Sequence, residues 1–400
     1  MKLLSVSWRY LLSQPLAAAL NLLLLTLGLA SISFVLLVGE QLDHAFERDL
    51  AGIDLVVGAK GSPLQLILAG VFHIDVPTGN IALQEVQELE KNPQVAELIP
   101  LSLGDSFRGF RIVGTSPAYP AHYQASLAQG AIWSQPMQAV VGAEVAHSTG
   151  LHVGAQFAGS HGLGAGGHAH GDNNYQVSGL LAPCACVLDR LVLTATESVW
   201  QVHEKATALD DEDRKIMHDE REVTMALIRY RSPLAAVSLP RLVNTTTGMQ
   251  AAAPAVEITR LLRMVGVGTD VLRGFGVVLL LSAGLSVFIA LWSAVRERRA
   301  DLAMLRMLGA PPAKVAGIVV CEALLLALLA SALGLLLGHL IVHGVGSWMQ
   351  AQRSLPLTGL IWLPVEWSVP AVGVSVALLA ALLPAIGAYR IDVTTLLNGR

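Results

Sequence analysis

Four long segments that are almost free of charged side chains limit what this chain can fold into. They occupy residues 14–38, 271–295, 315–343 and 368–389. Each exceeds the roughly 18 apolar residues that mark a membrane-crossing helix. Only 14% of all residues are charged, against about 25% in a typical soluble protein. The sequence therefore predicts a membrane protein with four transmembrane helices, and the first is too long for a cleaved signal peptide, so we expect it to remain as an anchor.

Basic residues are unevenly distributed around these segments. They occur in residues 1–13 and 390–400, five fall within residues 296–314, and residues 344–367 hold one. Lys and Arg beside a span resist translocation, so short basic segments stay in the cytoplasm. We therefore expect both termini and residues 296–314 inside the cell and residues 344–367 outside it. The pattern of residues 1–13 also predicts an amphipathic helix in the membrane interface.

Residues 39–270 form the one long stretch between predicted spans, and we expect them to fold outside the membrane. They hold 15 basic and 25 acidic residues, a charge of −10, so with −4 for the whole chain the remainder carries +6. A nucleic-acid partner would call for a basic patch, so we expect none. Helical patterns in residues 40–50 and 256–266 predict two stalk helices that lead into this domain.

Residues 296–314 have the pattern of a short amphipathic helix followed by a stop. Five basic residues accompany two acidic ones, and three leucines recur at a spacing of three. Gly309, Pro311 and Pro312 then end the helix. We expect this helix to lie along the inner membrane face with its charged side open to a soluble partner.

This segment resembles the coupling helix of the FtsX-like, MacB-type ABC transporter permeases, the mechanotransmission class that includes LolC/E-like proteins. The residues that match the pattern R-x-R-R-x-D-L-x-x-L-R-x-L-G-A are Arg296, Arg298, Arg299, Asp301, Leu302, Leu305, Arg306, Leu308, Gly309 and Ala310. The C-terminal sequence PAIGAYRIDVTTLLNG, residues 384–399, resembles the end of the same permeases. A charged loop that only fixes topology is the alternative interpretation of residues 296–314 alone.

The resemblance implies a permease subunit of a bacterial inner-membrane transporter, with its large domain in the periplasm and no enzyme activity of its own. ATP and Mg²⁺ would bind a separate ABC ATPase subunit, and the phosphate-loop pattern G-x-x-x-x-G-K-[ST] is absent from the chain. The other implied partners are a second permease protomer, membrane lipid and a periplasmic protein. The residues expected to couple to the ATPase are Arg296, Arg298, Arg299, Asp301, Leu302, Leu305, Arg306 and Gly309.

Short strand and helix patterns alternate through residues 39–270 and predict an α+β domain of one or two lobes. Strands are expected at residues 53–57, 107–113, 139–142, 175–180, 191–195 and 224–230. Helices are expected at residues 83–91, 197–203 and 234–244 and around Glu144. In this order they resemble the extracytoplasmic portion of MacB-type permeases, including AVVGAEVAHSTGLHVGAQF before a strand that ends in SGLLAP.

Residues 58–80 depart from that resemblance. They combine four glycines and two prolines with an apolar middle, residues 66–72. One interpretation is a buried loop, helix and loop. The other is an apolar contact surface for a substrate or partner.

A second departure could bind metal. Imidazole, carboxylate and thiolate groups are ligands for zinc and similar metals, and the candidates are His161, His168, His170, Asp172, Cys184 and Cys186. The two cysteines are too close in sequence for an easy disulfide, so we expect a thiolate pair or bonds elsewhere. An inert, glycine-rich hairpin tip is the alternative.

Three ionisable residues lie in the third predicted span. Glu322 is expected to contact another helix, because a lone carboxylate in the membrane is costly. His339 and His343 share one helix face near the outer end, where we expect interfacial placement, with metal binding as the alternative.

The sequence as a whole favours an ABC transporter permease subunit that passes ATP-driven motion to an outer domain. The action would be export or extraction of an envelope substrate such as a lipoprotein, peptide or drug. Two alternatives stay open: a signalling permease that regulates a periplasmic hydrolase without moving cargo, and a zinc-linked system that uses the histidine-rich loop.

Overall fold

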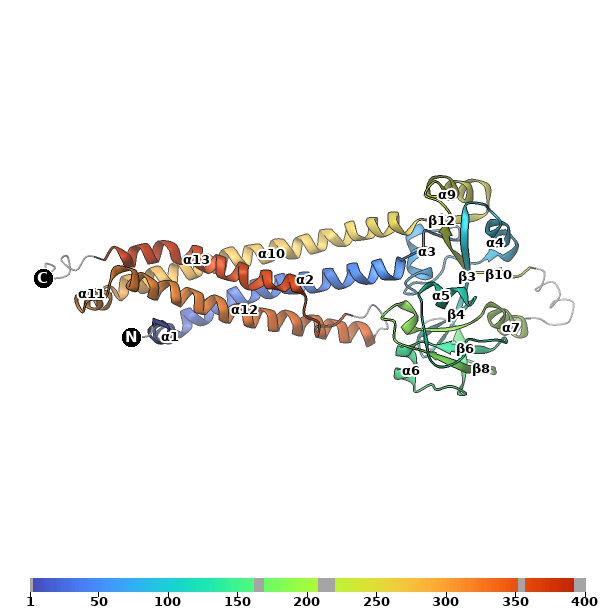
Figure 1. Cartoon of the computed structure of the whole chain (residues 1–400), viewed down its shortest axis with the longest axis horizontal. Coiled ribbons are helices and arrows are strands. Elements are labelled where there is room, and N and C mark those ends of the chain that lie inside the picture. The colour runs from blue at the N-terminus through green and yellow to red at the C-terminus, as the bar shows by residue number, and fades with distance from the viewer. Residues whose placement is uncertain (1–2, 162–168, 208–219, 352–356, 392–400) are drawn as a thin grey trace. The chain divides into compact units, whose positions relative to one another are not determined.

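The computed structural model describes residues 3–161, 169–207, 220–351 and 357–391 (Figure 1). The chain divides into two compact units. The helical unit comprises Met1–Leu42 and Val265–Arg400, and the inserted unit comprises Asp43–Met264.

Long apolar helices make up the helical unit. Its elements are α1 (Leu3–Ser13), α2 (Pro15–Leu50), α10 (Pro254–Glu297), α11 (Arg299–Met307), α12 (Pro312–Ala351), the 3-10 turn η2 (Pro364–Trp367) and α13 (Ser368–Tyr389). Within the described residues, four helices are long and apolar enough to cross a membrane, as predicted: α2, α10, α12 and α13. They run alongside one another in Figure 1.

Two of these helices extend well beyond the predicted spans. α2 continues without a break to Leu50, and α10 already begins at Pro254. The helical patterns at residues 40–50 and 256–266 therefore belong to the same continuous helices as the first and second spans. Each of these two helices contributes residues to both units.

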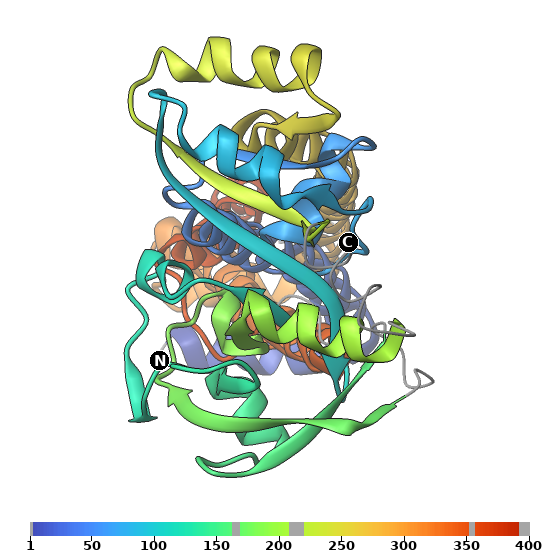
Figure 2. The same ribbon diagram turned by 90° about the vertical axis from the view of Figure 1, so that its right-hand side faces the viewer.

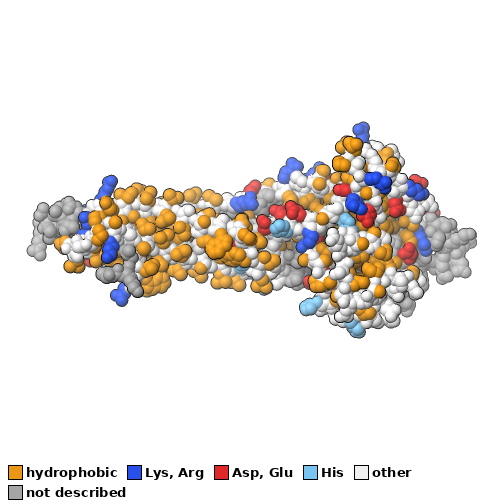
Figure 3. Space-filling model, viewed as in Figure 1, with side chains coloured by type: hydrophobic (Ala, Val, Ile, Leu, Met, Phe, Trp, Pro, Cys, Tyr) orange, Lys and Arg blue, Asp and Glu red, His pale blue; other side chains and the backbone are white. Residues whose placement is uncertain are grey.

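Small residues allow the membrane helices to approach closely. A Cβ added to Gly334 of α12 would lie 2.9 Å from Leu29 of α2, and one added to Gly338 would lie 2.7 Å from the Ser33 hydroxyl. Close backbone approach of this kind replaces the hydrophobic effect as the driving force between helices in lipid. Outward-facing side chains are largely hydrophobic, and Lys and Arg gather at the α11 end of the unit in Figure 3.

A polar cluster ties the segment between α12 and α13 to the bundle. Glu366 of η2 is fully buried, accepts a hydrogen bond from Ser33 of α2 (3.2 Å) and lies 2.9 Å from the Nε2 atom of His339. The Nδ1 atom of His339 donates to the carbonyl of Gly359 at 2.7 Å. His339 is therefore a structural link, and within the described residues it belongs to no metal-binding group.

The inserted unit is built on a mixed sheet with helices packed on it. Its strands are β1 (Leu55–Ala59), β2 (Ile81–Ala82), β3 (Val95–Phe107), β4 (Phe110–Thr115), β5 (Leu127–Gly130), β6 (Gln138–Val141), β7 (Gln156–His161), β8 (Ala169–Leu181), β9 (Leu191–Ala195), β10 (Glu222–Val223), β11 (Met225–Tyr230) and β12 (Met249–Ala252). Its helices are α3 (Pro63–Gly70), α4 (Leu83–Glu90), α5 (Ala118–His122), α6 (Ala143–Thr149), the 3-10 turn η1 (Val187–Arg190), α7 (Thr196–Thr207) and α9 (Ala235–Thr246).

The main sheet has the order β12-β1-β11-β3-β4-β9-β6-β8-β5, and β7 pairs with β3 and β8. β1, β11 and β12 share one hydrophobic core with α4 and α9, while β4, β6, β8 and β9 enclose a second. The long strand β3 (teal in Figure 2) connects the two sides, because it pairs with β11 and with β4. The unit therefore has two lobes.

The strand predicted at residues 107–113 is wrong at its start. Residues 95–107 form β3, and the chain reverses at Arg108 and Gly109, whose φ angles are 48° and 82°. This positive-φ pair is the geometry of a tight hairpin turn. In the sequence the strand-like alternation of residues continues through this turn, so the pattern did not reveal the turn.

The apolar middle of residues 58–80 is buried, which contradicts the contact-surface interpretation of residues 66–72. α3 places Leu66, Ile67 and Ala69 against the sheet, and Val71 and Phe72 after it are also buried. The Ser62 hydroxyl caps the helix by accepting from the N–H of Gln65, a common N-cap arrangement.

The predicted orientation can be tested by cysteine labelling in a Cys321→Ala background. Val237 of α9 is 80% exposed, and Ala313 follows the turn before α12 and is also exposed. We expect a membrane-impermeant maleimide to label Val237→Cys in intact spheroplasts and Ala313→Cys only after permeabilisation. Labelling of both positions from the same side would contradict the four-span arrangement.

Candidate functional site

The predicted coupling segment folds as α11, a short helix between α10 and α12. One residue, Arg298 (φ −94°, ψ 15°), separates α10 from α11. The helix ends at Met307, the φ of +94° at Gly309 favours glycine, and the N–H of Ala310 donates to the carbonyl of Leu305 at 3.1 Å. α12 then begins at Pro312, where the missing proline N–H costs little.

The two faces of α11 have different surroundings. Leu302 and Ala303 are 3% and 2% exposed and belong to the hydrophobic core of the helical unit. On the other face Met304, Met307 and Leu308 are 53%, 55% and 81% exposed. Since α11 is anchored through one apolar face, this second face is free to contact another molecule.

Several charged side chains of the segment lie beside that exposed face. Arg296, Arg299 and Asp301 are exposed. Arg306 donates instead to the carbonyl of Ile391, which lies two residues beyond the end of α13. α11 is thus also held by the segment after α13. Arg299 of α11 and Arg296 at the end of α10 are exposed to solvent.

Arg298 lies apart from the exposed face of α11, and its role in coupling stays a prediction. Its guanidinium lies 4.2 Å from the ring centre of Tyr10 in α1, and donates to the Tyr10 carbonyl at 3.2 Å and to the Ser13 hydroxyl at 2.8 Å. It also lies 3.9 Å from a carboxylate oxygen of Glu322 in α12. Arg298 therefore joins α1, α10 and α12.

The coupling candidates thus divide by position. Leu302 is buried and the Arg298 side chain is 14% exposed, so Met304, Met307 and Leu308 offer a soluble partner far more surface. Leu305 is half-buried and lines a pocket beside α11. The exposed residues Met304 and Met307 were missed, although Met304, Met307 and Leu308 follow the i, i+3, i+4 spacing of one helix face.

The predicted metal ligands are not brought together. His161 ends β7, His170 and Asp172 lie near the start of β8, and His168 lies outside the described residues. The cysteines follow the other end of β8, which runs to Leu181. At about 3.3 Å per residue, the strand separates Asp172 from Leu181 by about 30 Å. The strand therefore places Asp172 and the cysteines at its two ends, and metal binding by the histidines stays a prediction.

The cysteine pair itself differs from the prediction. Cys184 and Cys186 form a disulfide with each other, and Ala185 between them adopts a φ of 54°. The Cys184 N–H donates to the Asp189 carboxylate at 3.0 Å. The positive φ of Ala185 turns the chain back on itself, which brings the two sulfurs together despite the short spacing. Within the described residues no group of three or more His, Cys, Asp or Glu side chains is placed to hold a metal.

A buried polar cluster lies inside the inserted unit, and sequence reasoning missed it. The Nε2 atom of His73 is 2.9 Å from the Tyr119 hydroxyl, and the Nδ1 atom of His73 has no hydrogen-bond partner. Burial, together with Arg111 and Arg190, lowers the pKa of His73 well below its usual value. Burial also lowers the pKa of Arg111 to about 10, and its guanidinium donates to the Asp75 carbonyl at 2.6 Å. His73 is therefore held neutral beside cations.

The architecture and the sequence match two known domains. Residues 18–238 match the MacB-like periplasmic core domain, and residues 273–393 match the FtsX-like permease C-terminal domain. The chain belongs to the FtsX/MacB-type ABC transporter permeases. It is a multi-pass membrane protein with a large extracellular domain, and permeases of this type work with ABC ATPase subunits that carry the ATP hydrolysis.

Two solved structures are similar to this permease. One is the periplasmic region of MacB from Actinobacillus actinomycetemcomitans, at 12% identity and a TM-score of 0.35, covering 53% of this chain and 95% of that chain. The other is the extracellular domain of the noncanonic ABC-type transporter YknZ from Gram-positive bacteria, at 11% identity and a TM-score of 0.31, covering 50% and 98%. No curated protein matches the sequence.

Arg298 should contribute to the stability of the permease. Replacing it with Ala leaves the Glu322 carboxylate without its cation, and loss of one partner of a buried pair costs about 3 kcal/mol or more. We expect that loss in Arg298→Ala and its partial recovery in Arg298→Ala/Glu322→Leu, measured by denaturant unfolding of the detergent-solubilised protein. Arg296→Ala, at an exposed neighbour, is the control. Equal stability of the Arg298 and Arg296 variants would contradict a stabilising role for the contacts of Arg298 with α1 and α12.

His73 should make the stability of the permease fall in acid. Its folded-state pKa is depressed, so below about pH 6.5 the unfolded chain takes up a proton that the folded chain does not. The free energy of unfolding then drops by about 1.4 kcal/mol per pH unit from this group. We expect a shallower drop between pH 6.5 and 5 in His73→Asn, because Asn tolerates the φ of 55° at this position. Identical pH slopes in unfolding titrations would exclude this role.

Proposed function

We propose that this permease receives the ATP-driven movement of a separate ABC ATPase subunit at α11 and passes it to the inserted unit. The observation that supports this most is the two-faced environment of α11. Leu302 and Ala303 fix the helix in the hydrophobic core of the helical unit, while Met304, Met307 and Leu308 remain exposed. A subunit that binds the exposed face can therefore displace the whole bundle end.

The exposed face has the chemistry of a protein-binding site. Methionine adapts its shape to a partner, and burying a large apolar side chain contributes about 1.5–3 kcal/mol. Arg296 and Arg299 are exposed in the same segment and add charge that can select an acidic partner. The complementary surface on the ATPase is therefore expected to be an apolar depression with acidic residues at its rim.

Continuous helices offer a route for the movement. α10 is one helix of 44 residues from Glu297, next to α11, back to Pro254 in the inserted unit. At 1.5 Å per residue, a helix of this length extends for about 66 Å. A displacement at its α11 end therefore reaches the inserted unit without crossing a loop.

The same proposal includes what the inserted unit does with the transmitted movement. With a second permease protomer, the complex would export or extract an envelope substrate such as a lipoprotein, peptide or drug. In the signalling alternative the same motion would activate a periplasmic hydrolase. The two differ in what raises ATP turnover of the reconstituted complex: a cargo in the first case, and a periplasmic protein in the second.

Zinc binding by His161, His168, His170 and Asp172 remains a prediction. It no longer includes Cys184 and Cys186, because they form a disulfide with each other. Because neutral imidazole is the ligand, binding should weaken below about pH 6.5. Calorimetry of the purified permease with zinc, compared with a triple His→Ala variant, tests it directly.

The exposed face of α11 is tested by Leu308→Asp and Arg299→Glu. We expect each to weaken binding of the ABC ATPase that copurifies with the wild-type permease. For Leu308→Asp the loss should be about tenfold or more, because it removes the burial of one leucine. Affinity and ATP turnover would be measured on complexes reconstituted in nanodiscs.

Val237→Asp is the matched control, because Val237 is as exposed as Leu308 but lies in the inserted unit. All variants should unfold at the wild-type temperature. Wild-type affinity and turnover in both α11 variants would contradict the proposed coupling.

A further inference from the structure

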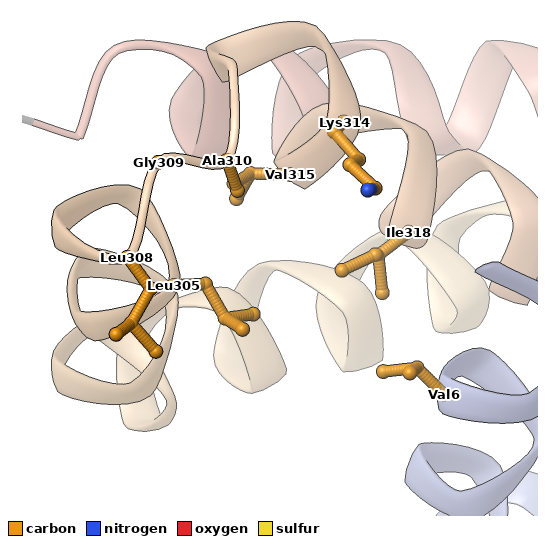
Figure 4. Close-up of a pocket in the computed structure, with 8 residues that line it drawn as sticks. All are labelled: Val6, Leu305, Leu308, Gly309, Ala310, Lys314, Val315 and Ile318. Carbon is orange, nitrogen blue, oxygen red and sulfur yellow. The ribbon is translucent and has the colours of Figure 1, made fainter. Parts of the chain in front are cut away.

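A pocket of about 220 Å³ lies beside α11, and its wall includes the N-terminal helix. Leu305 and Leu308 line it from α11, Val315 and Ile318 from α12, and Val6 from α1. Figure 4 shows Leu305, Ile318 and Val6 pointing into the same space from these three helices. Lys314 contributes the one ionisable side chain of the lining.

The size and chemistry of the pocket suit a single apolar side chain. Small-molecule sites usually measure about 300–1,000 Å³, so this pocket is small for a separate ligand. A cavity of about 150 Å³ lined by apolar residues already accepts benzene. A leucine, methionine or phenylalanine from a partner would therefore fit, and the ammonium group of Lys314 favours a carboxylate next to it.

Polar contacts fix α1 as a wall of this pocket. The Ser7 hydroxyl, which is fully buried, donates to the carbonyl of Ile318 at 3.0 Å. At the other end of α1, Arg298 binds Tyr10 and Ser13. Val6 is therefore held in position by contacts on the same helix, and a wall that is already ordered loses little entropy when it binds.

We propose that α1 and α11 form one composite socket that receives an apolar side chain of the ABC ATPase subunit. This inference rests on the proposed function and adds α1 to the docking surface. Leu308 supports the choice of occupant, because it belongs both to the exposed face of α11 and to the pocket. Lys314, Arg296 and Arg299 give the same end of the unit a positive charge that complements an acidic rim on the ATPase.

Site-specific photo-crosslinking tests the occupant. p-Benzoylphenylalanine would be placed at Val6, at Leu308 and, as a control, at Leu12, which lies on α1 but outside the pocket and is 62% exposed. The full-length permease is expressed with its ABC ATPase, and crosslinked partners are identified by mass spectrometry. We expect Val6 and Leu308, but not Leu12, to crosslink to the same ATPase polypeptide.

The other outcomes separate the inference from the proposed function. If Leu308 reaches the ATPase while Val6 reaches only its own chain, a second permease copy or no protein, the socket is wrong and the proposed docking on α11 stands. If neither position reaches the ATPase, the docking proposal itself is wrong.

Filling the socket gives an independent measurement. Val6→Trp should lower the affinity of the nanodisc-embedded permease for the ATPase about tenfold or more, comparable to losing the burial of one apolar side chain. Val6→Ala, which only widens the pocket, and Leu12→Trp, which adds the same bulk outside it, should bind nearly as the wild type does. Unchanged affinity in Val6→Trp, with an unfolding temperature equal to that of the wild type, would overturn the inference.

Discussion

The enclosed guanidinium of Arg298 holds together the end of the bundle on which the candidate site depends. It sits at the one-residue break between α10 and α11 and contacts α1 through Tyr10 and Ser13 and α12 through Glu322. A planar guanidinium offers five N–H donors and a flat face that stacks on an aromatic ring, whereas an ammonium group is a compact charge with three donors. The position of α1 relative to α11, and so the pocket between them, depends on this side chain together with the Ser7–Ile318 hydrogen bond.

The opposite end of the bundle is tied in a similar way. Buried Glu366 joins η2 to α2 through Ser33 and to α12 through His339. Between these two ends the helices pack through alanine, leucine and valine side chains and through close glycine contacts. Polar pairs are costly to separate in an apolar surrounding, so they fix the ends of the helices, whereas the apolar middle specifies only that the helices touch. This arrangement suits a bundle that moves as a unit.

Sequence reasoning succeeded where a pattern has a single physical meaning. Long uncharged runs predicted the four membrane helices, and the basic loop with its Gly-Pro stop predicted α11. It failed where the structure depends on residues that are neighbours in space but far apart in the sequence. Nothing in the local sequence shows that Arg298 finds Tyr10 and Glu322, or that β8 is long enough to separate Asp172 from the cysteines. His73 was missed because its partner, Tyr119, is 46 residues away.

The residues of the α11 motif have different surroundings, which shows why a motif cannot by itself identify a contact surface. The break at Arg298 starts a new helix, so the rotational phase of α10 does not carry over into α11. Leu302 then faces the hydrophobic core of the helical unit, Leu305 faces the pocket, and Leu308 faces both the pocket and solvent, although the three leucines are equally spaced and all belong to the same motif. Each step of three residues turns the side chain by about 300°, so the three positions progress around the helix. The same spacing that anchors α11 through Leu302 therefore places Leu308 on the exposed face with Met304 and Met307.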